Sequence, residues 1–190
     1  MAKTGERKAQ ILQTLAGMLE DPKGERITTA LLAARLDVSE AALYRHFASK
    51  AQMYEGLIEF IEQTLFTLVN KIQTEEKDAL KQVEATVTTL LGFSQKNPGM
   101  TRVLIGDALV NEDDRLQARV NQLLDRLEAS LRQSARLAVN AQQLPADWDV
   151  NAYANTLIAF VMGRWHQFAK SGFKRVPLDG WVQQWRVFAA

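Results

Sequence analysis

The stretch RITTALLAARLDVSEAALYRHFASKAQMYEGLIEF, residues 26–60, decides the fold of this chain. Apolar residues recur at helical spacing over 29–36 and again over 41–47, and only Asp37 and Val38 lie between the two segments. Two short helices joined by so tight a turn form a helix-turn-helix. The stretch then runs directly into a longer helical pattern, so we expect a long helix to carry the helix-turn-helix.

The turn and the helix starts in this stretch are marked by suitable side chains. Asp37 occupies the position where a left-handed residue is usually needed, and Asp is one of the few residues besides Gly that tolerates this conformation. Ser39 is expected to cap the second helix, and Glu40 places a carboxylate in its first turn, where the helix dipole favours it. Ser49 is expected to cap the long helix that begins at Lys50.

The composition limits the class of protein. The chain has 190 residues, of which 47% are hydrophobic, so it is long enough for one or two domains with a sizeable core. It has no Cys, which excludes disulfides, thiolate metal ligands and a cysteine nucleophile. The start, MAKTGERKAQILQTL, lacks the apolar core of a signal peptide, and no run approaches the roughly 20 apolar residues of a membrane span. We therefore expect a soluble cytoplasmic protein.

The charges are unevenly distributed, although the net charge is only +1. Residues 1–50 carry eight Lys and Arg against six Asp and Glu, whereas residues 51–90 carry seven acidic residues against three basic ones. The small basic excess therefore lies on the segment that is expected to face phosphate. It is too small to favour an architectural protein that compacts DNA without sequence preference.

Helical periodicity continues through the rest of the chain, and no useful length of β-alternation appears. The expected helices cover 6–20, which Pro22 and Gly24 end, then 50–75, 78–96, one or two short helices in 100–110, then 113–137, 149–171 and 179–190. Asn97-Pro98-Gly99 is the strongest breaker, and 140–147 is a polar linker. We predict an all-α protein with a helix-turn-helix head over 1–48 and a helical body over 49–190.

The second short helix is the candidate DNA-reading element. An α-helix fits the major groove, and small residues near its N-terminal end let the backbone approach the base edges. The candidate contacts in and after this helix are Ser39, Glu40, Ala41, Ala42, Tyr44, Arg45 and His46. Lys50 at the next helix start, and Thr28 and Thr29 at the preceding one, are expected to hold phosphates. From the pattern alone, a packing corner without DNA contact is the competing interpretation.

The sequence predicts neither a metal site nor a catalytic site. It contains two His, His46 and His166, no Cys, and no HExxH motif or carboxylate cluster with metal-ligand spacing. P-loop, GxSxG and GxGxxG motifs are also absent from the sequence. We therefore expect no metal, no cofactor and no enzymatic activity.

The segment LYRHF (43–47) followed by Ser49-Lys50 resembles the signature of the TetR family. The resemblance extends to the nucleoid occlusion branch of that family through ITTALLAARLDVSEAALYRHFASK (27–50), LIEFIE (57–62), LLGFSQKNPGMTR (90–102) and DRLQARVNQLLDRLEASLRQ (114–133). Asp37 in place of the usual turn Gly, Ala48 in place of the usual Pro, and the segment after Leu137 depart from the pattern.

This resemblance implies a TetR-like fold, in which a three-helix head joins a linking fourth helix and a helical body that dimerises. It implies a homodimer that binds palindromic sites in double-stranded chromosomal DNA, alone or with further dimers, and is nucleoid-associated. The DNA-bound form would inhibit polymerisation of the tubulin-like division GTPase FtsZ. Septation over the nucleoid would thereby be blocked.

The resemblance also implies an FtsZ-tail contact at Phe60, Gly92, Lys96 and Asn97. Gly within a helix costs about 1 kcal/mol relative to Ala, so close approach of another backbone is a reason for Gly92. Lys96 is suited to pair with acidic residues of a bound peptide. Without the resemblance, helix packing for Gly92 and a helix stop for Asn97 are the simpler interpretations.

The predicted helices 113–137 and 149–171 suit a four-helix dimer interface about a two-fold axis, which would space the two DNA-reading helices by roughly 34 to 36 Å. The competing function is a ligand-responsive repressor with a small-molecule pocket in the body. Its candidate lining is Phe160, Trp165, Phe168, Trp181 and Trp185. The same residues would serve equally well as core.

Overall fold

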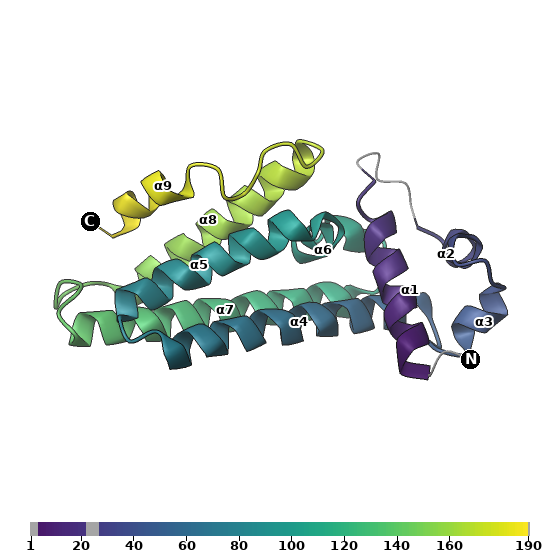
Figure 1. Cartoon of the computed structure of the whole chain (residues 1–190), viewed down its shortest axis with the longest axis horizontal. Helices are drawn as coiled ribbons and strands as arrows, with labels where there is room; N and C mark the ends of the chain where they lie inside the picture. Colours follow the sequence, from purple (N-terminus) through teal and green to yellow (C-terminus); the bar gives the residue numbers. More distant parts are fainter. Residues whose placement is uncertain (1–3, 22–26, 190) are drawn as a thin grey trace. The chain divides into compact units, whose positions relative to one another are not determined.

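The computed structural model describes residues 4–21 and 27–189, and every regular element in these ranges is helical (Figure 1). The elements are α1 Thr4–Met18, α2 Thr29–Arg35, α3 Glu40–Tyr44, α4 Lys50–Glu75, α5 Ala79–Lys96, α6 Pro98–Leu104, the 3₁₀ helix η1 Asp107–Leu109, α7 Asp114–Asn140, α8 Val150–Lys170 and α9 Trp181–Phe188. The all-α prediction is confirmed. The helix stop assigned to Pro22 and Gly24 lies outside the described residues.

The chain packs as two compact units. The first unit comprises residues up to Ile61 together with 97–120, and the second comprises 62–96 and 121–190. Helices α4 and α7 each contribute residues to both units. Packing thus groups α6, η1 and the start of α7 with the helix-turn-helix. The boundary between head and body at residue 48 stays a prediction.

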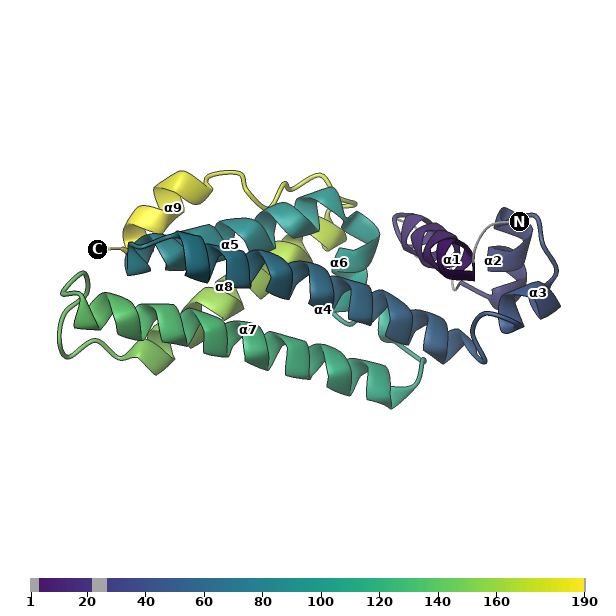
Figure 2. The ribbon, with the colours of Figure 1, turned by 60° about the horizontal axis from the view of Figure 1, so that its bottom comes forward.

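The first unit has an apolar core to which all of its longer helices contribute. Figure 2 shows α1 beside the α2–α3 pair. The core side chains include Ile11, Leu15, Leu19, Leu32, Leu43, Met53, Leu57 and Ile58, each at most 3% exposed. Lys8 adds a cation–π contact from α1, with its Nζ 5.4 Å from the centre of the Phe47 ring.

Helix α6 meets the end of α1 without space for a side chain. A Cβ built on Gly99 would lie 2.0 Å from the carbonyl oxygen of Ala16. Arg102, one turn further along α6, donates from Nη1 to the carbonyl oxygens of Leu19 at 3.3 Å and Asp21 at 3.2 Å. Its Nε pairs with Asp107 at 2.6 Å. Arg102 therefore satisfies carbonyl groups that the end of α1 leaves without intrahelical partners.

The second unit is built around α5 and α8, which pack along each other, and aromatic side chains fill its core (Figure 1). Trp165 is fully buried, and its indole N–H donates to the carbonyl oxygen of Leu90 at 3.2 Å. The Trp181 indole donates to Thr88 Oγ1 at 2.7 Å, and the Trp181 ring lies 5.5 Å from the Phe160 ring. Because their indole N–H groups are bonded and their side chains are at most 3% exposed, Trp165 and Trp181 serve as core side chains.

Gly99→Ala is expected to destabilise the protein by about 2 kcal/mol, because the added Cβ must displace backbone atoms of α1. For a chain of this length this loss lowers Tm by about 5 °C in thermal unfolding followed by circular dichroism. Gly17→Ala is the matched control, since a Cβ on Gly17 of α1 meets nothing within 4 Å. An unchanged Tm for Gly99→Ala would contradict the tight contact between α1 and α6.

Candidate DNA interface

The helix-turn-helix has the turn at Asp37 and the Ser39 cap that its sequence predicts, and it also has a cap at Thr28 that was not predicted. Thr28 caps α2 by accepting from the Leu31 N–H at 3.2 Å, and Ser39 caps α3 by accepting from the Ala42 N–H at 3.3 Å. Asp37 in the turn has φ of 53°, which confirms the left-handed conformation. The caps and turn fix the angle between α2 and α3 through local hydrogen bonds.

Helix α3 is shorter than the predicted 41–47, because it ends at Tyr44 with Arg45 as its C-cap. The Leu43 carbonyl accepts from the N–H groups of both His46 and Phe47, which closes the helix with a turn. The chain must change direction between α3 and α4, because the Ser49 side chain already accepts from the Gln52 N–H in the first turn of α4. The candidate contacts Arg45 and His46 therefore lie in the turn after the helix.

The outward face of α3 is formed by the residues that the sequence assigned to base reading. Glu40 and Ala41 are exposed, Ala42 is half-buried and Tyr44 is 45% exposed, whereas Leu43 is buried against the core. A helix face of this kind, with small residues at its N-terminal end, leaves room for the backbone to approach base edges.

Thr29, Glu40 and Tyr44 form a hydrogen-bonded cluster between the start of α2 and α3. The Thr29 hydroxyl donates to Glu40 Oε2 at 2.5 Å, and the Tyr44 hydroxyl donates to Thr29 Oγ1 at 3.5 Å. Sequence reasoning assigned these residues separately and did not predict that they contact one another. The cluster orients all three side chains before any ligand is bound.

His46 is half-buried, and its Nδ1 atom is buried without a hydrogen-bond partner in the described part of the chain. His46 lies in the turn directly after α3, next to the candidate contact Arg45.

Lys50 begins α4 and forms a salt bridge with Glu112, which follows η1. The two side chains are only 21% and 12% exposed, and the Lys50 ammonium lies 5.6 Å from the centre of the Tyr54 ring. Burial, together with the negative charge of Glu112, raises the pKa of Tyr54 to about 12, so its hydroxyl stays neutral. Sequence reasoning missed Glu112 because it lies 62 residues from Lys50.

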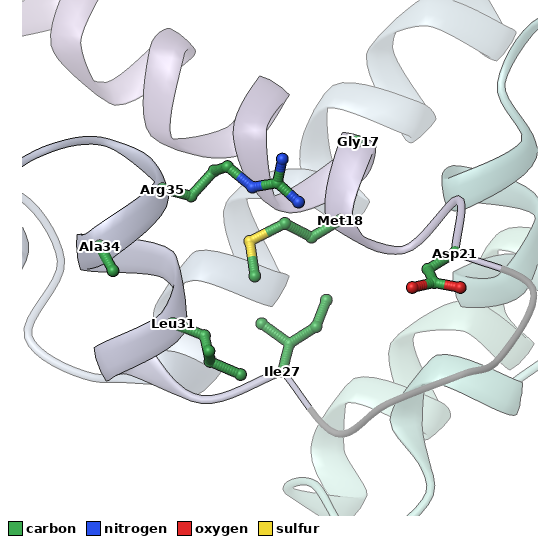
Figure 3. A pocket seen from close by; sticks show the side chains of 7 residues that line it. All are labelled: Gly17, Met18, Asp21, Ile27, Leu31, Ala34 and Arg35. Atoms are coloured by element: carbon green, nitrogen blue, oxygen red, sulfur yellow. The ribbon is translucent and has the colours of Figure 1, made fainter.

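A hollow of about 300 Å³ lies on the head between the end of α1 and α2. Figure 3 shows the Met18 side chain between the Arg35 guanidinium on one side and Leu31 and Ile27 on the other. The Asp21 carboxylate lies at one end (Figure 3). None of the predicted DNA-contacting residues lines this hollow.

The four predicted partner residues are divided between the two units. Phe60 of α4 and Asn97, the N-cap of α6, belong to the first unit, whereas Gly92 and Lys96 of α5 belong to the second. Phe60 is 49% exposed and Lys96 is exposed. A Cβ on Gly92 would meet only Leu178 Cδ1 at 3.7 Å, an ordinary contact. Packing between described residues therefore gives no reason for a glycine at this position.

The described helices include none that is long and apolar enough to cross a membrane. In the same part of the chain, no group of three or more His, Asp or Glu residues is arranged to hold a metal ion.

Comparison with known proteins places the sequence in a family. Residues 25–57 match the family described as bacterial regulatory proteins, tetR family, and residues 77–190 match the SlmA-like type of tetracyclin repressor-like C-terminal domain. The nucleoid occlusion factor SlmA of Alteromonas mediterranea is 52% identical over 98% of this chain and 95% of that protein. SlmA of Marinomonas sp. is 50% identical with the same coverage. The chain belongs to the SlmA branch of the TetR family.

Solved structures at lower identity share the fold. The fatty acid degradation regulator FadR from Bacillus halodurans has a TM-score of 0.81 at 13% identity, covering 99% of this chain and 97% of that one. The regulator PfmR from Thermus thermophilus has a TM-score of 0.78 at 20% identity, covering 94% and 96%. The predicted TetR-like fold is confirmed.

Family membership also confirms the predicted class of function. The SlmA branch consists of nucleoid occlusion factors, which are DNA-binding proteins of the TetR family and not enzymes. The individual DNA-contacting and partner-contacting residues stay predictions, because neither the family match nor the fold tests them.

Lys50→Ala is expected to weaken binding to all DNA sequences by about three- to tenfold. The slope of log K against log salt should become less steep by about one, which corresponds to the loss of one phosphate contact. The measurement is fluorescence anisotropy of a labelled duplex between 50 and 200 mM salt. Lys71→Ala is the control, because Lys71 lies on the same helix and is also paired, with Glu75 at 3.9 Å. An unchanged slope would remove Lys50 from the phosphate contacts.

Proposed function

We propose that this chain is a homodimeric nucleoid occlusion factor that binds palindromic chromosomal sites and, when bound to DNA, inhibits the polymerisation of FtsZ. The single observation that carries the proposal is the 52% identity to a nucleoid occlusion factor SlmA over 98% of the chain. Such a protein acts on the nucleoid in the cytoplasm and prevents the septum from closing over it.

The geometry of the head supports the DNA-binding part of the proposal. Helix α3 exposes small residues at its N-terminal end, and Tyr44 and Arg45 lie one turn further along. The Thr29 cluster and the two caps hold α3 in place, so little ordering is required when DNA binds. Base contacts from α3 would give sequence preference, and Thr28, His46 and Lys50 would fix the register on phosphates.

A stripe on α7 supports the dimer. Five residues share one face of this helix at helical spacing, namely Ala129, Arg132, Gln133, Arg136 and Leu137. Leu137 is 45% exposed. Arg132 donates to Asn151 at 3.4 Å and Asn155 donates to Glu128 at 3.1 Å, so α7 and α8 form one continuous surface. A second copy of the chain related by a two-fold axis would cover it.

The dimer is tested by sedimentation at micromolar concentration, where the chain is expected to sediment as a dimer. Leu137→Asp should shift it to the monomer, because the new carboxylate would be buried at the interface without a partner. Val187→Asp is the control, since Val187 is a 79% exposed apolar residue on α9. A monomeric parent protein would disprove the dimer.

Phe60, Gly92, Lys96 and Asn97 are the proposed FtsZ contacts. Phe60 offers a large exposed apolar side chain, and Lys96 offers an exposed cation in the last turn of α5. A side chain at Gly92 would make only an ordinary contact within its unit, and this supports the close approach of a partner backbone as the reason for the glycine. An extended peptide with apolar and acidic side chains fits this chemistry.

The alternative, a ligand-responsive repressor, is less favoured by the second unit. Trp165, Phe168, Trp181 and Trp185 are at most 9% exposed, and Phe160 packs against the Trp181 ring. A repressor that senses a small molecule in its body would show no DNA-dependent effect on FtsZ. The two functions therefore differ in whether DNA changes the effect of the protein on FtsZ assembly.

The deciding experiment is light scattering of FtsZ with GTP, with this protein added alone or together with palindromic duplexes drawn from its own chromosome. We expect DNA to strengthen the inhibition of FtsZ assembly. A mixed-sequence duplex of equal length controls for charge. If no DNA-dependent change appears although the protein binds the duplex, the nucleoid occlusion function is wrong and the repressor is favoured.

Lys96→Glu is expected to abolish the effect on FtsZ and leave DNA binding intact, because it reverses the charge offered to an acidic peptide. Lys81→Glu makes the same charge reversal at an exposed position of α5 and should behave like the parent. Anisotropy with labelled DNA and FtsZ light scattering are measured on the same preparations. Equal loss of FtsZ inhibition in both variants would exclude a specific contact at Lys96.

A further inference from the structure

The salt bridge between Lys50 and Glu112 occupies the side chain that the proposed DNA contact requires. Lys50 lies at the N-terminal end of α4, where its ammonium and the positive end of the helix dipole would meet a phosphate together. In this structure the ammonium instead contacts the Glu112 carboxylate and faces the ring of Tyr54. All three residues belong to the first unit, so the contact lies within one compact body.

The surroundings of Glu112 favour this pairing. Its side chain is 12% exposed, so the carboxylate has lost most of its contact with water and depends on a cation close by. The neighbouring Tyr54 hydroxyl is neutral, since its pKa is raised to about 12. Arg102, the other cation acting on Tyr54, is engaged by Asp107 and by the carbonyl oxygens at the end of α1. Lys50 therefore provides the charge that balances Glu112.

We infer that Glu112 is a positioning residue that competes with the DNA phosphate for the Lys50 ammonium and thereby limits the affinity for DNA. The inference rests on the proposed function, because it requires Lys50 to contact phosphate. Lysine is a compact charge on a flexible stem, so its ammonium is able to exchange one anion for another. A carboxylate and a phosphate on the same ammonium repel each other, and each DNA contact at Lys50 must therefore be made against Glu112.

The contact with phosphate carries no base information, so Glu112 weakens the binding of all sequences and leaves base reading to α3. The exchange also has a structural consequence. Glu112 directly precedes the first turn of α7, where the Asp113 carbonyl accepts from the Leu116 N–H at 2.9 Å. When DNA binds and Lys50 leaves Glu112, the salt bridge between the start of α4 and the residue before α7 is therefore lost.

The test compares Glu112→Gln with the parent by anisotropy on a labelled random-sequence duplex at 100 mM KCl. We expect Glu112→Gln to tighten binding by about three- to tenfold while lowering Tm slightly, because a salt bridge is lost. A purely structural role would lower both affinity and Tm. Glu112→Asp, which keeps the charge but shortens the reach to Lys50, should give a smaller gain and serves if Glu112→Gln does not fold.

Asp113→Asn is the matched charge control, because Asp113 is the next residue and its carboxylate pairs with Arg115 at 2.7 Å. It should bind DNA within about twofold of the parent, since the Asn side chain is still able to accept from the Arg115 N–H, as Asp113 Oδ1 does at 3.0 Å. In a Lys50→Ala background, Glu112→Gln should have no more effect than Asp113→Asn. A gain that persists without Lys50, or one that Asp113→Asn reproduces, would show a net-charge effect and overturn the inference.

If the parent protein binds the duplex and Lys50→Ala weakens this binding, Glu112→Gln decides the inference. Unchanged or weaker binding by Glu112→Gln would then disprove the competition by Glu112 and leave the proposed DNA binding intact. A parent protein that does not bind duplex DNA would remove the proposed function as well.

Discussion

The first unit depends on the close approach of α6 to the end of α1. Gly99 permits the approach because a side chain at this position would overlap the Ala16 carbonyl oxygen. Arg102 then satisfies the carbonyl groups of Leu19 and Asp21, which a helix end would otherwise leave without partners in a partly buried place. Because α1 supplies core side chains to the helix-turn-helix, this contact also determines how α2 and α3 are supported.

From Arg102 the interactions continue to the residue proposed to hold phosphate. The positive charge of the Arg102 guanidinium acts to lower the pKa of the buried Tyr54 hydroxyl. The Tyr54 ring faces the Lys50 ammonium, and Lys50 pairs with Glu112. Residues from α4, α6 and the segment before α7 are therefore joined by charge rather than by apolar packing alone. Such a network is sensitive to any anion that arrives at Lys50, because a charge in a partly buried site interacts more strongly than one in water.

Local chemistry explains which features the sequence was able to predict. Ser39 acts on the N–H group three positions further along and Asp37 on its own backbone, so the cap of α3 and the turn follow from the residue types alone. The Lys50–Glu112 salt bridge joins residues far apart in the chain, so no local sequence pattern predicts it. Asn97-Pro98-Gly99 ends α5 at Lys96, as the sequence predicts. Pro98 also begins α6 and Gly99 contacts α1, and only the packing against α1 reveals this second role.

The fold by itself leaves the function open, because regulators with 10% to 20% identity share it. The function therefore depends on which side chains of the body are buried and which are exposed. In this chain the indole groups of Trp165 and Trp181 are bonded inside the second unit, while Phe60 and Lys96 remain at the surface. A body that exposes apolar and basic groups is suited to respond to a macromolecule at its surface. DNA binding and partner binding would then be coupled through α4, which begins at Lys50 and carries Phe60.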